Sequence, residues 1–238
     1  MLVERALTES DIPLLATIDR TELIHQCYRV DGGQLVLYAA YHDMCGWPEG
    51  EAEQDAVALH ACLKRGGWLL GVFDGPALVA AAVVDNRTLH NQQLRMRQLK
   101  FLHVSHAARG LGLGGRLFAL ACEHGRQAGV DALYISATES RNTVDFYLRQ
   151  GCLLLPQPDP ELFAQEPHDI HLYRPIGEKK AVGLCYRSKY LSDYSKKSTL
   201  GNKVSTLRVS LISGPGSQLV YSLRHCASWE AVMGNGSI

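Results

Sequence analysis

The chain has 238 residues, of which 46% are hydrophobic and 20% are charged, so we expect a folded globular protein and exclude a wholly disordered one. Its formal net charge is zero, which argues against specific nucleic-acid binding because such proteins usually carry a basic excess. The longest apolar region, residues 68–84, is interrupted by Asp74, Gly75 and Pro76, which excludes a membrane-spanning helix there.

The N-terminal sequence MLVERALTES has charges where a signal peptide needs an apolar stretch, so we expect a cytoplasmic protein. The seven cysteines form no CxxC pair and show no metal-ligand spacing. We therefore expect reduced, mostly buried thiols and no metal site. Cys122 and Cys152 lie in apolar sequence contexts, which raise a thiol pKa and argue against either as a nucleophile.

The first predicted elements alternate between strand and helix. Residues 2–7 predict a short strand. Thr8, with an acid three residues later, predicts a helix N-cap, and helical apolar spacing continues to Ile18. Residues 19–30 predict a second helix or helical turn, and a further helix follows Pro48. We expect the buried side of that helix to carry Val57, Leu59, Cys62 and Leu63.

The middle of the chain predicts strands. Two apolar runs, residues 68–73 and 77–84, are separated by Asp-Gly-Pro and predict a hairpin. After a polar connection, residues 98–105 predict another strand, and helical spacing then runs from Leu113 to a stop at Gly129. The remaining predicted elements are a strand at 132–138, a short helix at 141–150, and strands at 152–156 and 168–176.

Charge and composition change near residues 175–177. The chain before this point is acidic on balance, whereas residues 178–238 are basic and rich in serine. We therefore expect one domain over residues 1–176 and a basic, Ser-rich C-terminal extension over 177–238, either poorly ordered or a small appendage. A fragment ending at residue 176 is expected to fold.

The glycine-rich segment HAARGLGLGG, residues 106–115, follows a predicted strand and precedes a predicted helix, which suggests a phosphate site. A triphosphate P-loop has the spacing GxxxxGK[ST], but Arg116 and Leu117 replace its lysine and hydroxyl residue. A dinucleotide fingerprint, GxGxxG, is matched literally, and Glu139 could serve as its ribose acid. That fingerprint needs a glycine directly at the strand end within repeated βαβ units, which this segment lacks.

A third interpretation fits the context. Arg109, Gly112 and Gly114 form R-x-x-G-x-G between strand and helix. This resembles the acetyl-CoA signature of the GCN5-related N-acetyltransferases (GNAT), and the resemblance covers about residues 1–176. It implies an α/β fold with a mixed, mostly antiparallel central sheet flanked by helices, and acetyl-CoA as co-substrate. The residues implied to bind the CoA pyrophosphate are Arg109, Gly110, Leu111, Gly112, Leu113, Gly114 and Gly115.

Other residues match the same family. Tyr147 precedes Gly151 by four residues, a spacing at which the family places a tyrosine that protonates the departing CoA thiolate. Asn142 is similar to the family's cofactor-contacting asparagine. The strand before the loop, at Leu102 to Val104, matches the family strand that splays from its neighbour and bonds to pantetheine amides.

The resemblance implies direct attack by a primary amine on the thioester, which needs a base. Glu22 and His103 are the first candidates, followed by His171 and Glu139. An acidic and aromatic segment at residues 41–51 suits a small cationic amine as acceptor. The alternatives are a protein or peptide N-acetyltransferase and a non-catalytic acyl-CoA-binding module. A homodimer is possible, and we expect neither membrane nor specific nucleic-acid binding.

Overall fold

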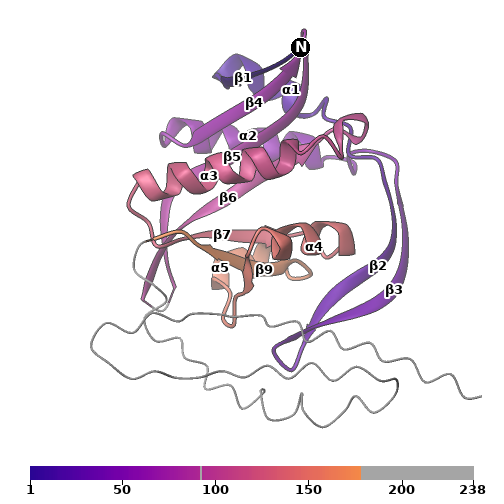
Figure 1. The fold of residues 1–238 in the computed structure, drawn as a ribbon, viewed down its shortest axis with the longest axis vertical. Helices are drawn as coiled ribbons and strands as arrows, with labels where there is room; N and C mark the ends of the chain where they lie inside the picture. The colour runs from indigo at the N-terminus through magenta and orange to yellow at the C-terminus, as the bar shows by residue number, and fades with distance from the viewer. Residues whose placement is uncertain (92, 178–238) are drawn as a thin grey trace, which may run out of the picture. The chain divides into compact units, whose positions relative to one another are not determined.

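The computed structural model describes residues 1–91 and 93–177. Within this part of the chain, seven strands form one sheet in the order β1-β4-β5-β6-β7-β9-β8 (Figure 1). Neighbouring strands are antiparallel except β6 and β7, which run parallel, so the predicted mostly antiparallel sheet is confirmed. The strands are β1 (Leu2–Ala6), β4 (Trp68–Asp74), β5 (Ala77–Asn91), β6 (Leu94–Val104), β7 (Ala132–Ala137), β8 (Leu153–Leu154) and β9 (Ile170–Pro175).

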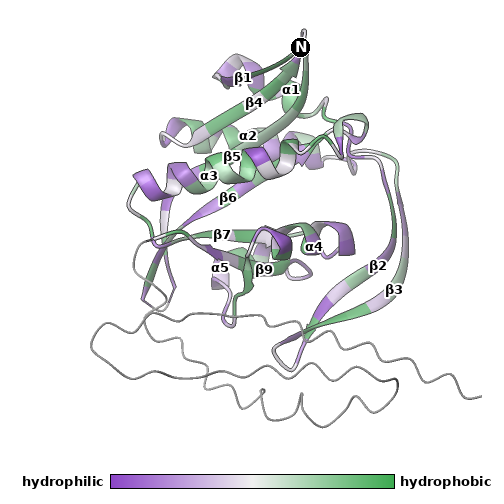
Figure 2. Cartoon of the chain, in the orientation of Figure 1, coloured by the Kyte–Doolittle hydropathy of each residue, from purple (hydrophilic) through white to green (hydrophobic). Residues whose placement is uncertain are grey.

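Helices pack on both faces of this sheet. Along β5 the side chains alternate: Ala82 and Val84 pack in a cluster with residues of α3 and α4, whereas Val83 packs with residues of α1 and α2. Figure 2 shows β4, β5 and β7 as predominantly hydrophobic strands, as expected for a sheet covered on both faces. The helical elements are η1 (Glu9–Asp11), α1 (Ile12–Leu15), α2 (Glu51–Lys64), η2 (His106–Ala108), α3 (Leu113–Gln127), α4 (Arg141–Arg149) and α5 (Pro160–Gln165).

The predicted helix over residues 19–30 is wrong. This segment lies largely in β2 (Glu22–Asp31), which pairs antiparallel with β3 (Gln34–Met44) as a separate two-stranded sheet. Gly32 and Gly33 form the turn with φ of +56° and +77°, a region that glycine enters without steric cost. Figure 1 shows the hairpin as a long curved ribbon to the side of α4.

The spacing of the buried side chains in β2 resembles that of a helix. The pairing register of β2 and β3 shifts between Ile24 and Gln26. The extra residue lies in β3, where Ala40 and Tyr41 stand opposite the single His25 of β2. In β2 itself the buried Ile24 and Cys27 stand three positions apart, and three-residue spacing of apolar side chains is also the pattern of a helix.

Element boundaries account for the smaller differences. The predicted polar connection before residue 98 belongs to β5 and β6, which stay paired out to Asn91 and Leu94. The helix α5 is absent from the predicted elements. Thr8 precedes η1 as predicted, and its N–H donates to the Asp11 carboxylate at 2.8 Å.

The buried side of α2 differs in part from its prediction. Val57 is 71% exposed, so it does not lie on the buried side of α2, whereas Leu59 and Cys62 do.

Among the described residues, no helix is long and apolar enough to cross a membrane. The predicted C-terminal extension lies outside the described residues from 178 onward, so its order and its role stay predictions.

Two substitutions on α2 test which face the sheet buries. Leu59 is 1% exposed and packs in the cluster under α1 and α2, so Leu59→Ala should lower the free energy of unfolding by about 2–5 kcal/mol. Val57→Ala, two residues away on the exposed face, should change it by less than about 0.5 kcal/mol. Urea unfolding of the two variants and the parent measures both values. Equal losses would contradict the orientation of α2.

Candidate active site

The glycine-rich segment at residues 106–115 connects β6 to α3, and we call it the glycine loop. Its backbone turns twice. Gly110 and Gly112 have φ of +81° and +80°, which L side chains rarely adopt. A Cβ built at either position meets no atom within 4 Å, so the backbone angle and not crowding requires glycine. The loop therefore leaves open space around the residues that start α3.

Free backbone donors gather at the start of α3. Gly112 is the N-cap residue and has no side chain with which to cap the helix. The N–H groups of Leu113, Gly114 and Gly115 consequently have no partner within the helix, and the helix dipole adds partial positive charge at the same place. This combination is an anion site suited to a phosphate.

β6 and β7 separate next to this loop. They pair only from Met96 with Ala132 to Gln98 with Tyr134, although β6 continues to Val104 and β7 to Ala137. On its other edge β6 remains paired with β5 up to Val104. The β7-facing backbone groups of β6 beyond Gln98 are thus without a strand partner in the described sheet, as the sequence predicts for Leu102 to Val104. Such groups can bind a ligand that has amides of its own.

A cleft of about 580 Å³ occupies this opening, and it brings the predicted site residues together. The exception is Leu111, whose side chain is 64% exposed and is not among the lining residues. Thr138, Ser140 and Phe146 also line the cleft. The predicted residues that line it are Glu22, Leu102, His103, Val104, Arg109, Gly110, Gly112, Leu113, Gly114, Gly115, Asn142 and Tyr147.

A polar network joins three elements across the cleft. Arg109, at the head of the glycine loop, donates from Nε to the Val104 carbonyl at 3.2 Å and forms a 3.4 Å ion pair with Glu22 of β2. Asn142 of α4 donates to the other Glu22 oxygen at 2.9 Å. Both oxygens of Glu22 are therefore engaged, which argues against Glu22 as a freely available base.

Tyr147 lies at the inner wall of the cleft on α4. Its ring packs edge-on against Phe118 and Phe146, and only 6% of the residue is exposed. Burial, followed by smaller contributions from Cys152 and then from the charge of Asp169, raises the pKa of the Tyr147 phenol above its ordinary value. The phenol therefore stays protonated over the neutral and mildly alkaline range, as a proton donor must.

His103 is a poor base in this setting. It lies on β6 with its ring edge-on to Trp47 and Phe101. Burial, followed by the positive charges of Arg20 and Arg109, lowers its pKa to about 3. A base works best with a pKa near the working pH, so this geometry argues against the prediction that His103 accepts the proton.

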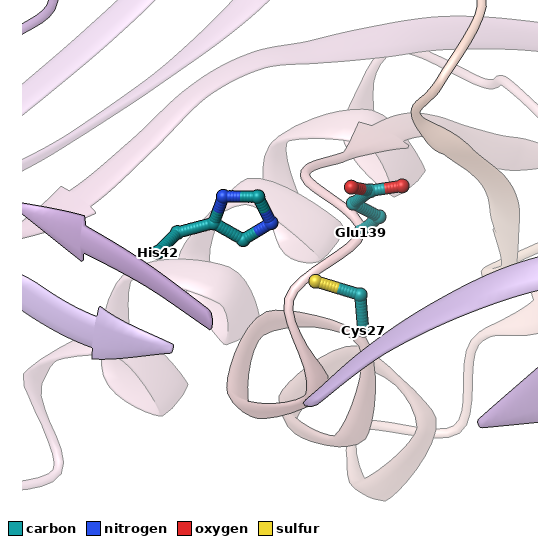
Figure 3. Close-up of side chains that lie close together, drawn as sticks. All are labelled: Cys27, His42 and Glu139. Carbon is teal, nitrogen blue, oxygen red and sulfur yellow. The ribbon is translucent and has the colours of Figure 1, made fainter. Parts of the chain in front are cut away.

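The other two predicted bases do not line the cleft. His171 of β9 is 3% exposed, and its Nδ1 lies 2.8 Å from the Tyr134 hydroxyl, so it is a core histidine. Burial lowers its pKa. Glu139, in the loop between β7 and α4, lies instead beside Cys27 and His42 of the hairpin (Figure 3).

The aromatic segment at residues 41–51 differs from its prediction. Trp47 does not offer a free face to a cationic amine, because the Arg20 guanidinium lies 4.4 Å from its ring centre. The indole N–H donates to the Ile18 carbonyl at 2.9 Å, and Arg20 also pairs with Glu51. Only Met44 of this segment lines the cleft.

Asp169, just before β9, is a functional candidate that sequence reasoning missed. Burial, followed by the negative charges of Glu166, Glu139 and Glu51, raises its carboxyl pKa to about 7. Its charge also raises the pKa of Tyr147. Glu166 lies three residues before Asp169, but Glu139 and Glu51 come from other segments, so the local sequence shows only part of this environment.

Of the five cysteines in the described part of the chain, four are buried, as predicted, and Cys45 is exposed. Burial raises the pKa of Cys152 to about 12 and also raises that of Cys122. Neither supplies a thiolate at neutral pH, so neither is a nucleophile.

With this geometry in view, comparison with known proteins assigns the domain. Residues 35–152 match the model of the acetyltransferase (GNAT) family. The chain carries a GNAT acetyltransferase domain. The matched region of this GNAT domain includes β6, the glycine loop and α4, and so most of the cleft. No protein of curated function matches the sequence.

Solved structures share the fold of the GNAT domain. Nourseothricin acetyltransferase is 18% identical with a TM-score of 0.54, covering 74% of this chain and 98% of its own. A GNAT acetyltransferase from Staphylococcus aureus Mu50 is 15% identical with a TM-score of 0.53, covering 74% and 99%. A candidate streptothricin acetyltransferase from Bacillus anthracis strain Ames, solved with acetyl coenzyme A, is 13% identical with a TM-score of 0.51, covering 74% and 99%.

The raised pKa of Asp169 predicts a pH-dependent stability. Between its ordinary value of 3.8 and about 7, the folded chain keeps a proton that the unfolded chain releases, so stability falls as pH rises through this window. Asp169→Asn removes this titration. The melting temperature of the variant minus that of the parent should therefore grow from pH 4 to pH 7.5 and then level off. A difference that is constant with pH would contradict the shift.

Proposed function

We propose that the chain is an acetyl-CoA-dependent N-acetyltransferase that acetylates a primary amine of a small molecule by direct attack. The observation that carries the proposal is the separation of β6 from β7. The cleft beside it is lined both by the residues whose free amides start α3 and by Tyr147 with its buried phenol. The GNAT domain assignment supports acetyl transfer independently.

The residues present fit acetyl-CoA. The free N–H groups of Leu113, Gly114 and Gly115 would hold the pyrophosphate, since they combine three donors with the dipole of a long helix. The unpaired edge of β6 at Leu102 to Val104 would bind the amides of pantetheine. When bound, acetyl-CoA supplies an activated acetyl thioester, whose transfer to the amine releases the CoA thiol.

Tyr147 is placed to donate a proton to the leaving sulfur. Its hydroxyl makes no hydrogen bond with the described residues, and it lines the cleft near the point where β6 and β7 part. Its raised pKa keeps the donor proton in place at neutral pH. The aromatic rings of Phe118 and Phe146 fix the direction of the phenol.

Asp169 is the group best matched to take up the proton of the amine. A pKa of about 7 lets it be ionised in part at neutral pH while remaining basic enough to accept a proton. Asp169, like His171 and Glu139, does not line the cleft, so this role requires a water molecule between Asp169 and the amine. Glu22 then acts as a positioning residue, holding Arg109 and Asn142 on opposite sides of the cleft.

The charges near Asp169 favour a cationic acceptor. Glu166, Glu139 and Glu51 act on the Asp169 carboxyl and raise its pKa, and they outweigh Arg20, which pairs with Glu51 and lowers it. Such an environment attracts an alkylammonium ion, which must then lose a proton before it attacks. A volume of about 580 Å³ is in the range of small-molecule sites.

The first test is ligand-dependent melting of the full chain. Acetyl-CoA at about 100 times its dissociation constant should stabilise the fold by about 2.7 kcal/mol, which raises the melting temperature by about 5–10 °C. NADH at the same concentration is the control and should have no effect. A shift with NADH alone would restore the dinucleotide interpretation of the glycine loop.

Kinetics of two variants test the proton donor and the proton acceptor. Tyr147→Phe should lower kcat about 100-fold with little change in the KM for acetyl-CoA, because the phenol acts on the transition state.

The acetylation rate of the parent should fall as the pH drops below about 7, because Asp169 becomes protonated. Asp169→Asn should remove this fall in rate. Release of free thiol from acetyl-CoA, with a small polyamine as acceptor, measures both.

The control is Tyr173→Phe, a partly buried tyrosine of β9 outside the cleft, which should keep full activity. A chain that binds acetyl-CoA without releasing thiol would be a non-catalytic acyl-CoA-binding module. If a lysine-containing peptide were acetylated faster than any small amine, the acceptor would be a protein and the small-molecule proposal would be wrong.

A further inference from the structure

Three potential metal ligands from separate segments meet outside the cleft. Cys27 lies on β2, His42 on β3 and Glu139 in the loop between β7 and α4. The ligand atoms of these three side chains all lie within 4.8 Å of one another. Figure 3 shows them gathered between the hairpin and the loop. Within residues 1–91 and 93–177, this is the one group of three or more such side chains at that spacing.

Backbone contacts hold the three segments in place. Cys27 pairs with Tyr38 across the hairpin and forms an isolated bridge with Ser140. The N–H of Tyr28 donates to the Glu139 carbonyl at 2.8 Å. His42 pairs with Ile24 across the hairpin, so each ligand is held at its backbone by contacts that do not depend on the side chains themselves.

The burial of the group is graded. Cys27 is 1% exposed, Glu139 is partly buried, and His42 is exposed. The site is thus closed on the side of the thiol and open on the side of the imidazole. A cation could enter from solvent, and the ring of His42 is free to adjust.

The donor set selects the metal. Thiolate sulfur, imidazole nitrogen and carboxylate oxygen are the three ligand types of zinc, whereas magnesium and calcium take oxygen ligands. We propose that Cys27, His42 and Glu139 bind one zinc ion, with a fourth position facing solvent. Tetrahedral zinc separates its ligand atoms by about 3.5 Å, so the exposed imidazole moves inward on binding, and the Cys27 thiol releases its proton to the buffer.

The zinc ion would clamp the hairpin to the loop that precedes α4. Ser140 in that loop caps α4 by accepting from the Thr143 N–H, and it lines the cleft. At its start, β2 provides Glu22, which accepts from Asn142. None of the three zinc ligands lines the cleft, so the ion supports its wall without taking part in acetyl transfer.

The test uses the full chain after removal of metal with a chelator. Zinc at about 100 times its dissociation constant should raise the melting temperature by about 5–10 °C, and metal analysis after dialysis should find one zinc per chain. Cobalt(II) should give the near-ultraviolet charge-transfer absorption of a thiolate ligand. Magnesium at the same concentration should cause neither change.

Variants locate the site. His42→Ala removes an exposed ligand, so it should leave the metal-free melting temperature unchanged and weaken zinc binding by about 10–100-fold or more. Cys27→Ser should abolish the cobalt absorption. The matched control is Cys45→Ser, an exposed thiol outside the group, which should bind zinc as the parent does. Absence of bound zinc, or unaltered binding by His42→Ala and Cys27→Ser, would overturn the proposal.

Discussion

The parting of β6 from β7 after Gln98 is the constraint on which the rest of the site depends. Two parallel strands that stayed paired would satisfy each other's backbone groups and leave no room between them. Because β5 holds the opposite edge of β6 as far as Val104, the strand stays extended while its free edge faces the cleft. The backbone groups on this edge face the open cleft, where water or a ligand can satisfy them.

The carboxylate of Glu22 links parts of the chain that are remote in sequence. It accepts from Asn142 on α4 and pairs with Arg109 at the glycine loop, while the strand that carries it belongs to the separate hairpin. The hairpin is docked further by Tyr28, whose hydroxyl donates to Asp145 at 2.9 Å. The cleft therefore has one wall built from the main sheet and another from an element outside that sheet.

The sequence predicted the parts of the site that depend on local geometry. Gly110 and Gly112 stand where a strand turns into a helix, and the need for positive φ is a property of those residues alone. The hairpin was missed because the buried Ile24 and Cys27 of β2 stand three positions apart, which is also helical spacing. The group around Cys27 and two of the three acids near Asp169 come from distant segments, so spacing in the sequence reveals neither site fully.

The β2–β3 hairpin also bears on how this domain could diverge. Its backbone hydrogen bonds run almost entirely between its own two strands, and Gly32 and Gly33 at its tip have no atom within 4 Å of their Cβ positions. Residues could therefore be inserted or deleted in pairs at the tip without breaking the central sheet or the glycine loop. Such changes would lengthen or shorten the hairpin, while Glu22, Ile24 and Met44, which line the cleft at its base, keep their places.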